Sequence, residues 1–162
     1  MKLIFEKLWR AAWPMAAVFL FDNLINNPLG FYDRWPHYDV PMHILGGVIT
    51  TWCLARFLKS VKVYTALKPR WLRYWFLIAN TALIGVVWEF YEWSFDYFFP
   101  WLSVQTSLTD TIGDLLNDLI GAAMYIVFIW WKSRKRVVTQ PIHEAVSTRS
   151  KPAKSLRTKK KA

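Results

Sequence analysis

Four long apolar stretches constrain the fold of this 162-residue chain more than any other feature. They cover approximately residues 8–27, 40–58, 74–95 and 112–131. A helix needs about 20 apolar residues to cross the hydrocarbon core of a bilayer, and each stretch comes close to that length. We therefore expect an all-α integral membrane bundle of about four transmembrane helices over residues 1–131.

The first stretch is the weakest candidate for a membrane-spanning helix, because its purely apolar run from Ala11 to Phe21 is short. A cleaved signal peptide is the alternative, but Asp22 and Asn23 follow the run where small residues of a cleavage site would be expected. The single cysteine, Cys53, excludes an intramolecular disulfide and is interpreted as a small core residue.

Basic residues predict the orientation of the chain. Lys2, Lys7 and Arg10 precede the first stretch, six more Lys and Arg surround the second connection, and others follow the last stretch. Arg34 is the only basic residue in the first and third connections. Under the positive-inside rule, both termini are cytoplasmic and the chain is a multi-pass membrane protein.

The segment 132–162 is rich in Lys, Arg, Ser and Thr, and it contains 11 of the 21 basic residues. We expect this tail to be disordered in the cytoplasm and attracted to anionic inner-leaflet lipids. No aromatic residue is interleaved with its charges, so we do not expect a nucleic-acid partner.

Acidic residues carry independent information, because the positive-inside rule depends on Lys and Arg. Nine of the 11 carboxylates map to the outer half of the predicted bundle: Asp22, Asp33, Asp39, Glu89, Glu92, Asp96, Asp110, Asp114 and Asp118.

Helical spacing arranges these acids in stripes that we expect to face one another. The stripes are Asp22 with Asn26; Asp39, His43 and Gly46-Gly47; Gly85, Glu89, Glu92 and Asp96; and Asp110, Asp114, Asp118 and Gly121. Three groups from three stretches, His43, Glu89 and Asp118, lie roughly 6–12 Å inside the predicted outer boundary.

Simpler roles exist for several of these residues. Asp39 and Asp110 stand where helices begin, so each could cap a helix. Glu92 and Asp22 could face water or lipid headgroups at the outer surface. Glu89 and Asp118 fit such roles least, because an ionisable side chain well inside a span is costly unless it is paired or hydrated.

Carboxylates crowded into a low-dielectric site need either bound protons or a cation. If a cation fills this role, the candidate ligands of a divalent metal site are His43, Asp39, Glu89, Asp114 and Asp118. One imidazole with several oxygens suits Zn, Mn or Fe, or Mg and Ca if the histidine only assists. Other polar residues expected at this site are Glu92, Asp110, Asn117 and Asp22. Asn117 could orient a substrate hydroxyl or phosphate, or equally make a hydrogen bond that packs the helices.

Three short elements carry a family resemblance over about residues 38–125. They are Tyr38-Asp39 with His43, then Trp88-Glu89 with Glu92-Trp93, and finally Asp110-Thr111, Asp114, Asp118 and Gly121-Ala122. In this order they resemble the VanZ-like and YjdF-like group of small polytopic bacterial membrane proteins. Glu92 and Asp118 stand where VanZ-like proteins typically carry Gln and Asn, so the chain is more similar to the YjdF-like side.

The resemblance implies a polytopic domain in the bacterial plasma membrane with a polar intramembrane cluster. VanZ is associated with teicoplanin resistance, which points to the cell envelope, but the group supplies no reaction.

Our leading hypothesis is a metal-dependent enzyme that acts on a lipid or envelope-precursor head group, with Glu89 or Asp118 as general base and His43 as ligand or acid. The alternatives are an ion- or proton-coupled transporter that uses the same carboxylates and a non-catalytic envelope assembly subunit. A transporter also needs polar groups in the cytoplasmic half, where the sequence offers only neutral residues such as Thr50, Thr51 and Thr81.

Overall fold

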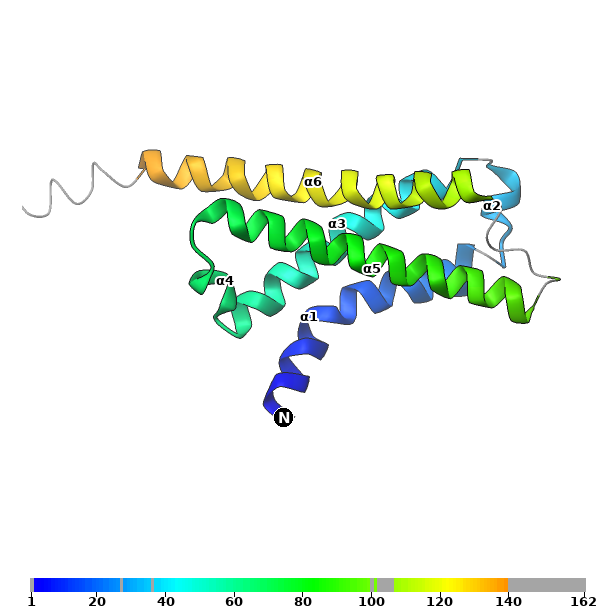
Figure 1. Ribbon diagram of the computed structural model, residues 1–162, viewed down its shortest axis with the longest axis horizontal. Helices are drawn as coiled ribbons and strands as arrows, with labels where there is room; N and C mark the ends of the chain where they lie inside the picture. The colour runs from blue at the N-terminus through cyan, green and yellow to red at the C-terminus, as the bar shows by residue number, and fades with distance from the viewer. Residues whose placement is uncertain (1, 27, 36, 100, 102–106, 140–162) are drawn as a thin grey trace, which may run out of the picture. The chain divides into compact units, whose positions relative to one another are not determined.

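The computed structural model describes residues 2–26, 28–35, 37–99, 101 and 107–139, and every regular element in these ranges is helical. In chain order the elements are α1 (Lys2–Phe21), the π-helical turn η1 (Asp22–Asn26), α2 (Phe31–Arg34), α3 (Asp39–Ser60), α4 (Val63–Ala66), α5 (Arg70–Phe98) and α6 (Leu108–Thr139) (Figure 1). The all-α prediction is therefore confirmed for the described residues.

Three helices are long and apolar enough to cross a membrane: α3, α5 and the part of α6 from Leu108 to Arg134. Helix α1 is 20 residues long but includes the charged side chains of Glu6, Lys7 and Arg10. Helix α1 is not among the helices that are long and apolar enough to cross a membrane. Three candidate spans are therefore shown, and the fourth crossing at residues 8–27 stays a prediction.

The predicted spans 40–58, 74–95 and 112–131 lie inside α3, α5 and α6, and each helix continues past its predicted ends. Ser107 caps α6: the Asp110 N–H donates to Ser107 Oγ at 3.2 Å, and the Thr111 N–H donates to the Ser107 carbonyl at 3.1 Å. The capping role considered for Asp110 is thus filled by Ser107. Helix α6 continues to Thr139, whereas residues 140–162 of the predicted tail lie outside the described residues.

The described residues divide into two compact units, one that ends at Val127 and one that begins at Phe128. In the first unit, α3 packs against both α1 and α5. In the second, the described part is the end of α6, where Arg134 lies over the Trp130 ring, with its Cζ 4.0 Å from the ring centroid.

Apolar side chains of α6 face outward while its polar side chains are buried. Ile112, Leu116 and Met124 are each more than half exposed, whereas Asp114 and Asp118 are buried. A water-soluble helix has the opposite arrangement, so this pattern suits a helix surrounded by lipid.

Helices α3 and α6 cross at backbone contact. A Cβ atom added to Gly47 would overlap the Asp118 carbonyl oxygen, and one added to Gly121 would overlap the Ile44 carbonyl oxygen. Only glycine allows such an approach, as in other membrane helix pairs with small residues at the crossing. The expected role of these glycines is confirmed, and the crossing brings the polar stripes of α3 and α6 together.

Candidate metal centre

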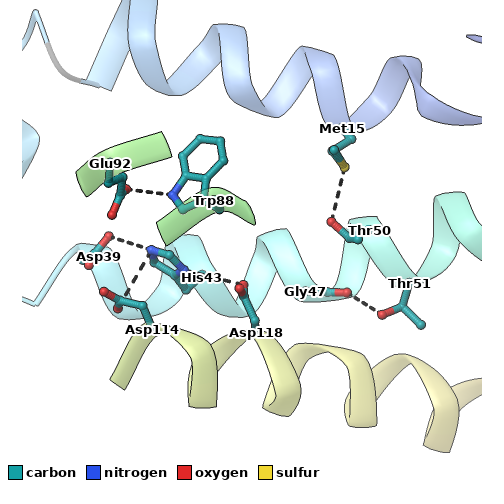
Figure 2. Close-up of polar contacts among 10 residues, drawn as sticks. All are labelled: Met15, Asp39, His43, Gly47, Thr50, Thr51, Trp88, Glu92, Asp114 and Asp118. Atoms are coloured by element: carbon teal, nitrogen blue, oxygen red, sulfur yellow. Dashed lines mark hydrogen bonds and ion pairs between the residues drawn. The ribbon is translucent and has the colours of Figure 1, made fainter. Parts of the chain in front are cut away.

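His43 lies at the centre of the polar stripe of α3 and is 8% exposed. Its Nε2 atom is 3.4 Å from Asp39 Oδ1, one helical turn earlier, and 3.9 Å from Asp114 Oδ1 on α6. Figure 2 shows these two carboxylates beside the same ring nitrogen. One candidate ligand atom from each of the three residues lies within 4.8 Å of the others, so the group could hold a metal ion.

The other ring nitrogen of His43 faces a different carboxylate. Nδ1 lies 3.5 Å from Asp118 Oδ1, one turn beyond Asp114 on α6 (Figure 2). An Nδ1–H that donates to Asp118 leaves the Nε2 lone pair directed at Asp39 and Asp114. This is the carboxylate–histidine arrangement that orients metal-binding imidazoles in many proteins.

Asp39 and Asp114 also offer carboxylate oxygens within 4.8 Å of each other. Two carboxylates at this separation repel each other unless a proton or a cation lies between them. The Asp39 carboxylate therefore takes part in the same cluster as His43 and Asp114.

Two glycines make room for Asp118 between α3 and α5. A Cβ atom on Gly85 would lie 2.6 Å from Asp118 Oδ2, whereas one on Gly46 would lie 3.7 Å from Asp118 Oδ1. The first distance is a clash and the second is an ordinary van der Waals contact. Gly85 thus sets the position of the carboxylate that faces His43.

We predict that Gly85→Ala displaces the Asp118 carboxylate and weakens its contact with His43. The readout is the pair of ¹⁵N chemical shifts of the His43 ring, which report which nitrogen carries the proton. Gly46→Ala is the matched control and should leave these shifts unchanged. Equal shifts in both variants would contradict the positioning role of Gly85.

Glu89 and Glu92 lie on α5. Glu89 is buried at 6% exposure, and Glu92 accepts a hydrogen bond of 2.7 Å from the Trp88 indole N–H (Figure 2). Glu92 is close enough to Glu89, His43 and Asp39 for their charges to interact. Glu89 is not in the group of three converging ligands, although the sequence predicted it as a ligand.

Two of the remaining predicted site residues, Asp22 and Asp110, lie near Asp39. Asp22 accepts a hydrogen bond of 2.7 Å from the Tyr32 hydroxyl, and both Asp22 and Asp110 interact electrostatically with Asp39. Burial, with added effect from Asp22, raises the pKa of Tyr32, so this hydroxyl stays a donor. Asn117 is half-buried on α6.

The electrostatic balance of the centre is strongly negative. Residues 35–55 and 74–131 contain no Lys or Arg, so α3 beside the centre, α5 beyond Arg73 and α6 up to Trp131 supply no basic side chain other than His43. One imidazole cannot neutralise the surrounding carboxylates. The centre therefore favours cations or bound protons over anions.

Sequence reasoning missed the roles of Tyr32 and Trp88. The signal for Trp88 was present, because it lies four residues before Glu92 and so shares its helix face. No local signal identified Tyr32, whose contact with Asp22 depends on how the chain folds back between α1 and α3.

Sequence comparisons agree with this architecture. The family described as "Predicted membrane protein (DUF2238)" matches residues 9–135. An uncharacterized protein of Thermotoga maritima is 26% identical over 126 residues, which are 78% of this chain and 64% of that protein. This chain therefore spans less than two thirds of that relative's length. No solved structure matches the chain. By the match to residues 9–135, the chain belongs to the DUF2238 family of predicted membrane proteins.

Proposed function

We propose that this membrane protein holds a divalent metal ion and uses it for catalysis on a lipid or envelope-precursor head group. The observation that carries the proposal is the convergence of Asp39, His43 and Asp114 on one point, with all three ligand atoms within 4.8 Å of one another. Two carboxylate oxygens and one imidazole nitrogen form a common donor set for catalytic metals.

The spacing of the donor atoms fits a metal. Ligands at 2.0–2.2 Å from a tetrahedral metal lie about 3.4 Å from one another. The two distances from His43 Nε2, 3.4 Å and 3.9 Å, are close to this value. Zn, Mn and Fe suit the mixed donor set, while Mg and Ca would rely on the carboxylates.

The metal would supply Lewis acidity or an activated water. We assign Asp118 to orienting His43, because it faces the nitrogen opposite the proposed ligand nitrogen. Glu89 is then the proposed general base, since it is a buried carboxylate outside the ligand group. We assign Glu92, which accepts a hydrogen bond from Trp88, to holding substrate or water near the metal.

We also propose four crossings with both termini in the cytoplasm of a bacterial cell. The charge asymmetry of the connections supports this orientation. It places the metal centre in the outer half of the plasma membrane, with the basic tail at anionic inner-leaflet lipids. The resemblance to VanZ-like and YjdF-like proteins agrees with a role in the cell envelope.

A cation or proton transporter is the second candidate. Buried hydroxyls on α3 and α5 lie beyond the metal centre. The Thr51 hydroxyl on α3 donates to the Gly47 carbonyl at 2.7 Å (Figure 2). The Oγ1 atom of Thr81 on α5 lies 2.8 Å from the Oγ1 atom of Thr51. These hydroxyls are already hydrogen-bonded to protein. For that reason we rank transport below catalysis.

One experiment separates these functions. Metal-loaded protein is incubated with a bacterial lipid extract, and head-group products are followed by mass spectrometry. We expect a metal-dependent product that Glu89→Gln abolishes while still binding metal. Metal uptake into sealed proteoliposomes without any product would indicate transport. An envelope phenotype unchanged by Glu89→Gln and Asp118→Asn would indicate an assembly role instead.

The orienting role of Asp118 gives a separate prediction. Asp118→Asn should lower metal affinity by about 10–100-fold, the usual cost of losing the carboxylate partner of a metal-bound histidine. Competition titration with a fluorescent zinc chelator measures this change. Glu6→Gln, which removes the same charge from an exposed position on α1, tests charge alone and should not reproduce it. Unchanged affinity in Asp118→Asn would exclude the orienting role.

A further inference from the structure

The connection between α3 and α5 carries a strong concentration of positive charge. Six basic residues lie within residues 56–73: Arg56, Lys59, Lys62, Lys68, Arg70 and Arg73. No Asp or Glu occurs anywhere between residues 40 and 88. The counter-charge for this connection must therefore come from outside this stretch of the chain.

Tyr64 on α4 organises two of these cations. Lys59 Nζ lies 5.1 Å from the centroid of the Tyr64 ring, and Arg73 Cζ lies 5.2 Å from it. Cation–π attraction holds the end of α3 and the start of α5 around the same ring. We call the group of Lys59, Tyr64 and Arg73 the Tyr64 platform.

The guanidinium of Arg73 is fixed by a second contact. Its Nε–H donates to the Leu67 carbonyl at 2.7 Å, which uses one of five N–H donors. Burial raises the pKa of Tyr64, so the ring stays neutral beside the two cations. The platform thus presents an ordered pair of positive charges on a neutral aromatic base.

The position of the Tyr64 platform indicates which anions are available to it. It joins α3 to α5, two helices that are long and apolar enough to cross a membrane, so it lies at a membrane surface. Trp71 and Trp75 at the start of α5 are 59% and 63% exposed, as aromatic residues at the lipid–water boundary commonly are. The abundant anions at this depth are lipid phosphates.

We propose that the Tyr64 platform binds the head group of an anionic phospholipid. Lys59 and Arg73 contact the lipid phosphate, and Trp71 and Trp75 lie against the acyl chains of the lipid. The proposal is independent of the metal centre: His43 and Lys59 are 16 residues apart on α3, or about 24 Å along the helix.

Native mass spectrometry of the full chain in detergent tests the proposal, with dioleoyl phosphatidylglycerol and dioleoyl phosphatidylcholine as probes. We expect the wild-type protein to bind phosphatidylglycerol at least 10-fold more tightly. Lys59→Gln with Arg73→Gln should remove most of this preference. Lys2→Gln with Lys7→Gln removes the same charge elsewhere and should retain it.

A second pair of variants separates the platform from general electrostatic attraction. Tyr64→Phe keeps the ring and should bind phosphatidylglycerol as the wild type does, whereas Tyr64→Leu should lose several-fold in affinity at unchanged net charge. Equal binding by all variants, or equal loss in the Lys2 and Lys7 control, would overturn the proposal. Displacement of the lipid by millimolar inorganic phosphate would overturn the assignment to a lipid.

Discussion

Gly47→Ala is expected to destabilise the protein by about 3 kcal/mol, near the upper end of the range for overpacked sites. The added Cβ would overlap the carbonyl oxygen of Asp118, which is backbone and cannot rotate away. Helices α3 and α6 must then separate, and this separation pulls Asp118 and Asp114 away from His43. Unfolding in SDS, followed by Trp fluorescence, measures the loss of stability.

Gly113→Ala is the matched control for Gly47→Ala. Gly113 lies on α6, and a Cβ built there meets no atom within 4 Å. Alanine in an open helical position should stabilise the helix by about 0.5–1 kcal/mol through the lower entropy of its unfolded state. If both variants lost the same stability, the close crossing of α3 and α6 would be wrong.

His43→Ala is expected to reduce divalent metal affinity by about 10³-fold or more, since it removes the nitrogen donor and leaves Asp39 and Asp114 as a two-carboxylate site. Isothermal titration with Zn²⁺, Mn²⁺ and Mg²⁺ in detergent measures the affinity for each ion. The affinity for Zn²⁺ should fall by a larger factor than the affinity for Mg²⁺, because Mg²⁺ depends mainly on oxygen ligands.

His37→Ala provides the control for non-specific metal binding. His37 is exposed and outside the group of converging ligands. Its removal should leave the high-affinity step of the titration intact. A titration in which both histidine variants behave alike would show that metal binds at the surface and not at the proposed centre.

The approach of α3 to α6 could be predicted from the sequence because both helices obey a simple repeat. Asp39 and His43 are four residues apart, as are Asp114 and Asp118, so each pair shares a face. Glycines on the same faces predicted close contact, and the structure confirms this at Gly47 and Gly121. Helical periodicity and these glycines were therefore enough to predict that His43 faces Asp114 and Asp118.

Helical periodicity could not predict which role each acidic residue has at the site. Asp118 and Asp114 lie on one stripe, yet they face opposite nitrogens of His43. Glu89 lies at a similar predicted depth but is outside the ligand group, because depth does not fix the rotation of α5 about its axis. Side-chain direction at a helix crossing depends on packing, which sequence spacing does not contain.

Short helices and long-range contacts also could not be predicted from the sequence. Helices α2 and α4 have four residues each, too few to show a helical repeat. The Tyr64 platform depends on α4, because this short helix brings Tyr64 between residues of two longer helices. Likewise, the bond from Tyr32 to Asp22 joins residues of different elements.

Elemental analysis of the purified, detergent-solubilised chain tests the central claim most directly. After loading with Zn²⁺, Mn²⁺ or Fe²⁺ and removal of excess ion, the wild-type protein should retain about one tightly bound metal per chain, as expected for one ligand cluster. His43→Ala should retain almost none, while Glu89→Gln, outside the converging ligands, should keep it. Wild-type protein that carries no metal under any loading condition would contradict the account.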